Sequence, residues 1–278
     1  MKVVFILGSG HCGSTLLDLL LDSHSKIVGV GEIATLTPNS LCACGQVAHE
    51  CNFWNNIINW KGDYSFKIYR SKLNFLLSRN IFVSPQRPHK KISLNDYIKK
   101  SEKVFAQILV NTGTRVIVDS SKNVNRAELL SKSKNIEPIF IHLVRDGRAV
   151  VWSYMKKYNK FLPFAWKWAA ENLKIEVLKR RNQAKYIYIN YSDLCRNPEK
   201  VLKRILNVLE LKFEPQMLDF RKNKHHQIGG NRMKFSGSSQ IKEDKEWRKK
   251  MPFSKRFIFN ILFGWLNFYY KVKNLIKI

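Results

Sequence analysis

Short, uninterrupted apolar runs constrain the fold of this chain more than any other feature of its sequence. Each run has the length of a buried strand, and most are followed by residues with the apolar periodicity of a helix. The runs lie at residues 3–7, 27–30, 116–118, 139–144 and 186–189. Buried strands that alternate with helices form a parallel sheet covered on both faces. The sequence therefore predicts an α/β fold of three layers, with helices on both sides of a central parallel sheet.

The loops that follow these runs should carry the ligand site, because such sheets bind ligands at the carboxyl ends of their strands. The four loops expected along this rim begin at Gly8, Gly31, Asp119 and Arg145. With 278 residues, of which 45% are hydrophobic, we expect one domain over residues 1–278. An irregular insertion at about 35–100 separates the second run from the third, and acceptor recognition is expected there.

The chain is strongly basic, with 49 Lys and Arg residues against 21 Asp and Glu and a net charge of +28. This excess favours anionic ligands, an acidic polymer or an anionic membrane surface, although a solvated lysine-rich surface explains it equally well. The tail at about 254–278 predicts a basic, aromatic helix that either packs on the domain or lies in a membrane interface. Its uncharged stretch, 257–270, is 14 residues long, where a span needs about 20. With no signal-peptide pattern, we expect a cytoplasmic protein, with peripheral membrane contact as an alternative.

A cluster of possible metal ligands lies in the segment CACGQVAHEC, which contains Cys42, Cys44, His49 and Cys51. Its spacing differs from the usual C-x₂-C arrangement of zinc sites. The chain has five cysteines, and an odd count without a secretion signal argues against a disulfide framework. We therefore expect reduced thiols, or an occasional disulfide, rather than a zinc centre.

The segment GSGHCGSTLL, residues 8–17, follows the first apolar run and is similar to the phosphate loop GxxxxGK[ST]. Gly10 and Gly13 permit a tight turn, and backbone N–H groups at a helix start form a nest for an anion. Ser14 and Thr15 add hydroxyl donors, but Ser14 stands where such loops have lysine. Lys122, at another strand end, could reach the transferring group instead.

Three classes of function remain open from these residues. The sequence VIVD, ending at Asp119, is typical of the magnesium-binding strand of nucleotide hydrolases and supports a P-loop kinase or hydrolase. The missing loop lysine argues against that class, because γ-phosphate transfer uses both the lysine and a metal. An anionic-polymer binding protein is supported by the charge, but no nucleic-acid motif is present and no nucleic-acid partner is expected. A transferase of a less highly charged group fits the altered loop.

Taken in order, the motifs resemble the sulfotransferases that use 3′-phosphoadenosine 5′-phosphosulfate (PAPS), especially the bacterial, carbohydrate and tyrosylprotein types. The resemblance covers residues 3 to about 35 and about 115 to 250, and its strongest parts are GHCGSTLL and LVRDGRAVVWS. It implies that the 5′-phosphosulfate is held by Gly10, His11, Cys12, Gly13, Ser14 and Thr15. It also implies that Arg145 and Ser153 hold the 3′-phosphate.

Weaker parts of the resemblance extend this assignment. YIYINYSDL implies that Tyr191 lies near the adenine, and IGGNRMKF implies a loop that closes over the nucleotide. The residues implied in that loop are Asn231, Arg232 and Lys234.

The resemblance also implies the catalytic groups. Glu32, in VGVGEIATL, would be the base that accepts the proton of an acceptor hydroxyl, and Lys122 would contact the sulfuryl group. His11 occupies the place of an arginine that is common in this family. Unlike arginine, a histidine has a charge that depends on pH. The implied reaction releases adenosine 3′,5′-bisphosphate and needs no metal. The acceptor is expected to be a saccharide, a glycolipid or another hydroxyl-bearing molecule.

Overall fold

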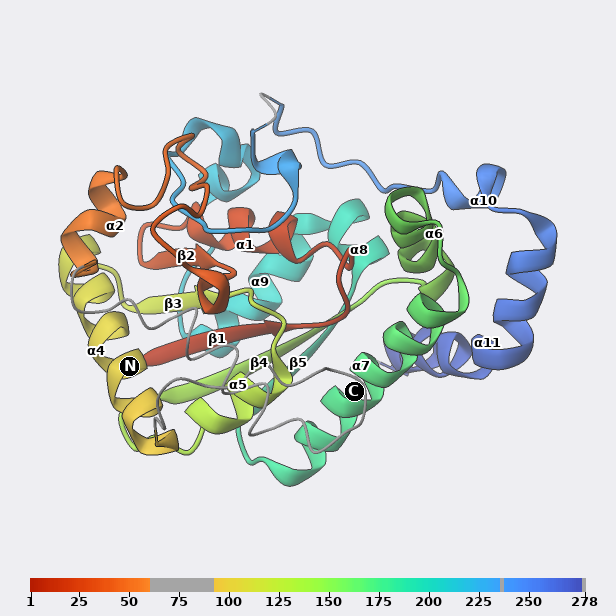
Figure 1. The fold of residues 1–278 in the computed structure, drawn as a ribbon, viewed down its shortest axis with the longest axis horizontal. Helices are drawn as coiled ribbons and strands as arrows, with labels where there is room; N and C mark the ends of the chain where they lie inside the picture. Colours follow the sequence, from red (N-terminus) through yellow and green to blue (C-terminus); the bar gives the residue numbers. More distant parts are fainter. Residues whose placement is uncertain (61–92, 236–237, 277–278) are drawn as a thin grey trace.

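The computed structural model describes residues 1–60, 93–235 and 238–276. Its centre is a five-stranded parallel sheet with the order β2-β3-β1-β4-β5 (Figure 1). The strands are β1 (Lys2–Leu7), β2 (Ile27–Gly31), β3 (Val116–Asp119), β4 (Glu137–Val144) and β5 (Lys185–Asn190). Each coincides with one of the apolar runs, so the predicted α/β class and parallel sheet are confirmed.

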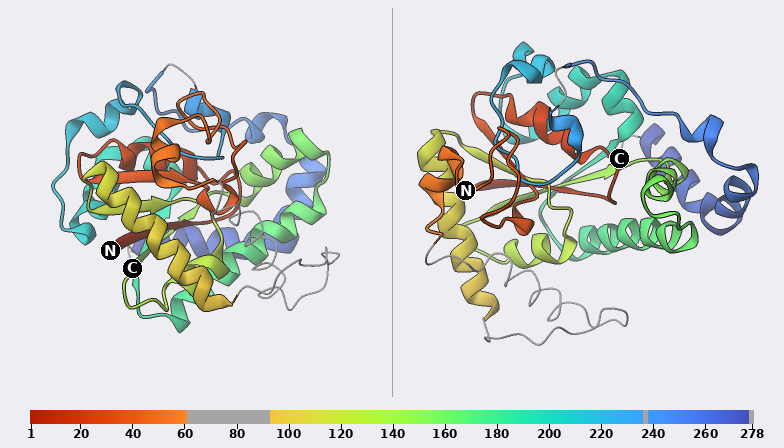
Figure 2. Two further views of the ribbon diagram at one scale, coloured as in Figure 1. Left: turned by 60° about the vertical axis from the view of Figure 1, so that its left-hand side comes forward. Right: turned by 45° about the horizontal axis from the view of Figure 1, so that its top comes forward.

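Alternate residues of the central strand β1 face two separate cores. Val3 and Phe5 belong to a core shared with α4 (Leu94–Thr112), α5 (Val124–Leu130) and α7 (Leu162–Arg181). Val4 and Ile6 belong to the opposite core, which includes α1 (Ser14–Asp22), α8 (Tyr191–Arg196) and α9 (Pro198–Leu209). Figure 2 shows these helices on the two faces of the sheet. The predicted three-layer arrangement is confirmed.

A third cluster of buried side chains includes Val144 of β4 and Tyr188 of β5. It joins α7 to α6 (Gly147–Tyr158), α10 (Trp247–Lys250) and α11 (Phe253–Ile276). The C-terminal helix α11 buries Phe259, Phe263, Leu266 and Tyr270 there. The expected basic, aromatic helix therefore forms and packs on the domain, while its outer side still exposes large apolar residues. Among the described helices, none combines the length and the apolar character needed to cross a membrane.

Because all five strands are parallel, their carboxyl ends share one edge of the sheet, as predicted. Two short helices lie among the loops near this edge: η1 (Ile33–Thr35) and η3 (Arg232–Phe235), with η2 (Pro215–Lys222) preceding the latter. Helix α2 (Asn52–Ile57) packs against α4 instead. The described part of the expected insertion contains η1 and α2. The remainder of that insertion, 61–92, lies outside the described residues.

Candidate active site

Two glycines of the loop between β1 and α1 lie so close to tyrosine side chains that no larger residue fits there. Gly13 has φ 101°, and a Cβ there would lie 2.5 Å from Cδ2 of Tyr191. A Cβ on Gly10 would lie 2.1 Å from the hydroxyl of Tyr154. Helix α1 begins at Ser14 with no side-chain hydrogen bond capping it. Its first N–H groups therefore remain available to an anionic ligand.

His11 and Cys12 occupy different environments within this loop. His11 adopts φ 62°, and its ring meets that of Tyr154 edge-on at 4.6 Å. Burial lowers the pKa of His11, and the nearby positive charges of Arg145, Lys157, Lys122 and Lys156 lower it further. The side chain of Cys12 is fully buried in the core, so only the backbone of Cys12 can contribute to the loop. His11 therefore enters the site as a neutral ring near pH 7.

Glu32 and Lys122, separated by 90 residues, form an ion pair at the sheet edge. The Lys122 Nζ lies 2.6 Å from Glu32 Oε1 and also donates to the Ser120 carbonyl oxygen at 3.0 Å. The two residues follow β2 and β3, which are neighbours in the sheet. Their side chains are 26% and 14% exposed respectively, so an incoming acceptor can reach them. The structure thus brings together the expected base and the expected sulfuryl contact.

Arg145 follows β4 and is held in a fixed orientation. One guanidinium nitrogen, Nη1, donates to the His11 carbonyl oxygen at 3.0 Å, and Nη2 donates to Asp244 Oδ2 at 2.9 Å. The guanidinium also lies over the Tyr191 ring, 4.6 Å from its centroid. Its Nε is buried and has no hydrogen-bond partner among the described residues. This arrangement leaves a charged donor group available to a ligand.

Two other residues expected at the nucleotide lie on the helices after β4 and β5. The Ser153 hydroxyl donates to the Ala149 carbonyl oxygen of its own helix at 3.0 Å. Tyr191 begins α8, where its ring lies beneath Gly13 and Arg145. Burial raises the pKa of Tyr191 to about 12, so its hydroxyl stays protonated. Tyr191 therefore joins the phosphate loop to the arginine.

The segment around Ile228–Asn231 closes against the loop and the expected base. The Asn231 N–H donates to Thr15 Oγ1 at 3.0 Å, and the Glu32 N–H donates to the Ile228 carbonyl oxygen at 2.6 Å. Arg232, just beyond, is exposed. The Lys234 side chain is buried, and its ammonium group donates to the carbonyl oxygens of Leu41 and Gln227. In this conformation Lys234 holds two segments together and does not present its charge to the site.

Asp119, which supported the kinase interpretation, is buried in an ion pair. Its Oδ2 lies 3.0 Å from Arg126 Nε, and both side chains are 1% exposed. Its Oδ1 accepts the N–H of Ser121 at 2.9 Å. A magnesium ligand must present its carboxylate to an accessible metal. The structure therefore assigns Asp119 to the interior of the protein, as the counter-ion of Arg126.

The cysteine segment also differs from its expected arrangement. All five cysteines are free thiols. Cys42, Cys44 and Cys51 converge, but the fourth candidate ligand, His49, is turned toward the Pro38 carbonyl oxygen, 2.9 Å from its Nδ1. The histidine that meets the thiols is His226, far along the sequence.

Comparison with known proteins identifies the family of this chain. A model of the sulfotransferase family matches residues 3–215. The chain belongs to the sulfotransferase family. The family makes it a transferase, and the motif resemblance to sulfotransferases is confirmed.

A solved structure at a TM-score above 0.5 shares the fold of this sulfotransferase. A sulfotransferase domain from the curacin biosynthetic pathway has a TM-score of 0.58 at 17% identity, covering 95% of this chain and 97% of that one. A sulfotransferase domain from the Synechococcus PCC 7002 olefin synthase has a TM-score of 0.49 at 20% identity, covering 95% and 94%. An uncharacterized protein of Aquifex aeolicus (strain VF5) is 23% identical over 237 residues, which are 80% of this chain. The sulfotransferase spans 27% of the length of that relative.

The structure adds site residues of this sulfotransferase that the sequence did not reveal. Asp244 orients Arg145, and Tyr154 lies against Gly10 and His11. Glu171, on α7, is half-buried, and partial burial raises the pKa of its carboxyl group. Its Oε2 has no hydrogen-bond partner among the described residues. None of these side chains lies in a motif, although the position of Tyr154 next to Ser153 could have drawn attention to it.

Proposed function

We propose that this sulfotransferase moves a sulfuryl group from PAPS to a hydroxyl group of its acceptor, with Glu32 as the base. The observation that carries the proposal is the Glu32–Lys122 ion pair, a carboxylate and an ammonium group 2.6 Å apart at the edge of the sheet. A base and a cation are the two groups that in-line transfer to a hydroxyl requires. The same proposal treats residues 1–278 as one catalytic domain.

The residues present fit a nucleotide phosphosulfate. Cβ atoms on Gly10 and Gly13 would collide with Tyr154 and Tyr191, and the start of α1 is uncapped. The buried, unpartnered Nε of Arg145 fits a phosphate, since guanidinium groups bind phosphates through several N–H donors. PAPS, when bound, supplies a sulfuryl group that is attacked at sulfur while adenosine 3′,5′-bisphosphate leaves.

The protein's own groups have separate tasks in this proposal. Glu32 accepts the acceptor's hydroxyl proton. Lys122 pairs with Glu32 before the acceptor arrives and then stabilises negative charge on the sulfuryl oxygens. His11 donates one ring N–H to the same charge. Arg145, held by Asp244 and Tyr191, orients the nucleotide. The buried Asp119 takes no part.

The donor is tested by calorimetric titration with adenosine 3′,5′-bisphosphate, in parallel with ATP and magnesium. We expect micromolar binding of the bisphosphate without metal, lost in Arg145→Ala. Arg148→Ala is the matched control, because Arg148 lies on the same segment but pairs with Asp146. Preference for ATP with magnesium, or bisphosphate binding unaffected by Arg145→Ala, would contradict the proposal.

The base is tested with Glu32→Gln, which keeps the shape of the side chain and removes its charge. Loss of a general base lowers turnover by roughly 10²–10⁴-fold. Bisphosphate affinity should stay near that of the wild type, because Glu32 contacts the acceptor and not the nucleotide. Turnover equal to that of the wild type would remove Glu32 from the mechanism.

The acceptor is proposed to be an anionic saccharide or a glycolipid headgroup, supported by the net charge of +28. We further propose a cytoplasmic location at the membrane surface. Free thiols support the first part, since cytosolic cysteines are kept reduced. The outer side of α11 supports the second: it exposes Phe257, Ile261, Trp265 and Phe268. Basic residues flank these side chains, as is typical of helices that lie in an anionic interface.

Membrane contact is tested by sedimentation with phosphatidylserine-rich vesicles. We expect the triple variant Phe257→Ser, Trp265→Ser and Phe268→Ser to stay in the supernatant while the wild type sediments. Val110→Ser is the control, because Val110 is an exposed apolar residue on α4. Equal sedimentation of the wild type and the triple variant would end this proposal.

A further inference from the structure

Three thiols and an imidazole meet beside the proposed active site. The Sγ atoms of Cys42, Cys44 and Cys51 and a ring nitrogen of His226 all lie within 4.8 Å of one another. We propose that these four groups bind a structural zinc ion. This replaces our expectation of simple thiols or a disulfide, and it exchanges His49 for His226.

The distances agree with a tetrahedron around one ion. With Zn–S bonds of about 2.3 Å and Zn–N bonds of about 2.0–2.1 Å, its edges are about 3.8 Å between sulfurs and about 3.6 Å from sulfur to nitrogen. The Cys51 Sγ lies 3.6 Å from that of Cys44, 3.7 Å from that of Cys42 and 3.3 Å from His226 Nδ1. Cys42 Sγ lies 3.7 Å from the same nitrogen. The two remaining pairs involve Cys44, which is exposed and can move inward.

The donor set selects the metal. Three thiolates and one imidazole form the Cys₃His set of closed, four-coordinate structural zinc sites. Soft sulfur ligands disfavour magnesium and calcium, which bind oxygen. Four protein ligands leave no open position for a substrate, so the ion would stabilise the fold and take no part in the transfer reaction.

The local backbone holds the thiols in place. Between Cys42 and Cys44 the chain turns sharply: the Gly45 N–H donates to the Cys42 carbonyl oxygen at 3.0 Å, and Gly45 has φ 94°. The Cys42 N–H in turn donates to the Gln46 carbonyl oxygen at 2.9 Å. Cys51 is the N-cap residue of α2, and its buried Sγ lies 3.7 Å from that of Cys42.

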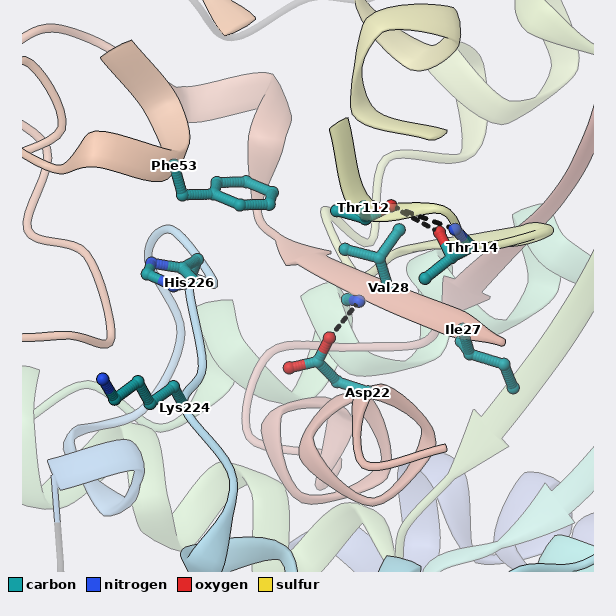
Figure 3. Close-up of a pocket in the computed structure, with 9 residues that line it drawn as sticks. Asp22, Ile27, Val28, Phe53, Thr112, Thr114, Lys224 and His226 are labelled. Atoms are coloured by element: carbon teal, nitrogen blue, oxygen red, sulfur yellow. Dashed lines mark hydrogen bonds between the residues drawn. The ribbon is translucent and has the colours of Figure 1, made fainter. Parts of the chain in front are cut away.

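The fourth ligand, His226, is oriented by two aromatic side chains of α2. The Trp54 Nε1 donates to the His226 carbonyl oxygen at 2.8 Å, and the Phe53 ring is stacked on the imidazole at 4.8 Å. Figure 3 shows Phe53 and His226 together in a pocket beside β2, with Lys224 beyond them. The exposed Cys44 gives an ion a path into the cluster.

The cluster links two segments that the proposed active site depends on. Cys42 forms an antiparallel bridge with Ile228, and the Ile228 carbonyl oxygen accepts the N–H of Glu32. Asn231, three residues further, contacts Thr15. A zinc ion would therefore tie the cysteine segment to the loop that borders both the base and the phosphate loop. This effect on the site rests on the proposed function, whereas metal binding itself does not.

Metal content of the full chain, purified with zinc and then freed of unbound metal, tests the site directly. We expect about one zinc per chain in the wild type and in His49→Ala, and much less in His226→Ala and Cys42→Ser. The two histidine variants are a matched pair, since only His226 contacts the thiols. Wild-type protein with less than about 0.1 zinc per chain, or equal zinc in both histidine variants, would overturn the proposal.

Cobalt keeps the test valid if a variant folds poorly. Cobalt added to the metal-free wild type should give the intense visible and near-ultraviolet bands of a tetrahedral thiolate site. His226→Cys should retain these bands at shifted positions, because a fourth thiolate preserves the coordination. Weak, octahedral-type bands in both proteins would refute the site. Because this readout is independent of PAPS, it separates failure of the zinc site from failure of the proposed function.

Discussion

The buried pair of Asp119 and Arg126 gives the most direct test of the distinction between a sulfotransferase and a metal-dependent kinase. Asp119→Asn removes one charge and keeps the oxygen that accepts the Ser121 N–H. Arg126 then stays in the core without its counter-ion, because both side chains are 1% exposed. Breaking a buried pair in this way costs about 3–5 kcal/mol.

The assay is urea denaturation followed by tryptophan fluorescence. Asp146→Asn is the control: its pair with Arg148 is partly exposed to solvent, and asparagine still caps α6. A surface pair is worth about 0–1 kcal/mol, so this variant should unfold close to the wild type. The double variant Asp119→Asn with Arg126→Met should be less destabilised than Asp119→Asn alone, because no unpaired charge remains.

The opposite pattern would refute this reasoning. If Asp119→Asn unfolds within about 1 kcal/mol of the wild type, the pair does not carry the energy of a buried charge. Loss of magnesium-dependent ATP binding in that stable variant would assign Asp119 to a metal, and the kinase interpretation would stand.

Three further predictions follow from single residues. Gly13→Ala should weaken bisphosphate binding in calorimetry by at least about tenfold, because φ 101° and the Tyr191 ring both oppose a Cβ; unchanged affinity would contradict the loop geometry. Burial and Arg145 lower the pKa of His11, and a bound anion favours its protonated form, so wild-type affinity should rise as pH falls below about 6.5. His11→Arg should lack the rise in affinity that comes from protonation of His11. Ionisation of the ligand affects both proteins equally, so an identical pH dependence of affinity in the two proteins would exclude a role for His11. Burial raises the pKa of Asp18 to about 8, so folding retains a proton that the unfolded chain releases. The stabilisation by Asp18 is complete below about pH 4 and is lost as the pH rises through about 8. In urea titrations, the free energy of unfolding of Asp18→Asn should therefore rise relative to that of the wild type between these pH values. A difference in unfolding free energy that does not change with pH would contradict the raised pKa.

Local patterns were sufficient to predict the sheet and the edge where the site lies. A run such as 3–7 buries its side chains on both faces, and this requirement acts within a few residues. Glycine at Gly10 and Gly13, followed by hydroxyl residues, likewise predicts an anion loop from local chain geometry. Glu32 and Lys122 could be placed at strand ends for the same reason, since parallel strands share one edge.

Tertiary structure alone decided which of these groups meet. The ion pair of Glu32 and Lys122 exists because β2 lies next to β3, an order that strand patterns do not encode. His226, and not His49, contacts the thiols because Cys42 pairs with Ile228, and this long-range pairing brings the neighbouring His226 to the cysteines. Arg145 likewise pairs with Asp244, which is 99 residues away in the sequence. Periodicity and motif spacing describe neighbours along the chain, whereas these contacts arise from packing between distant segments. The sequence by itself therefore determined the sheet and its rim, but not which side chains meet there.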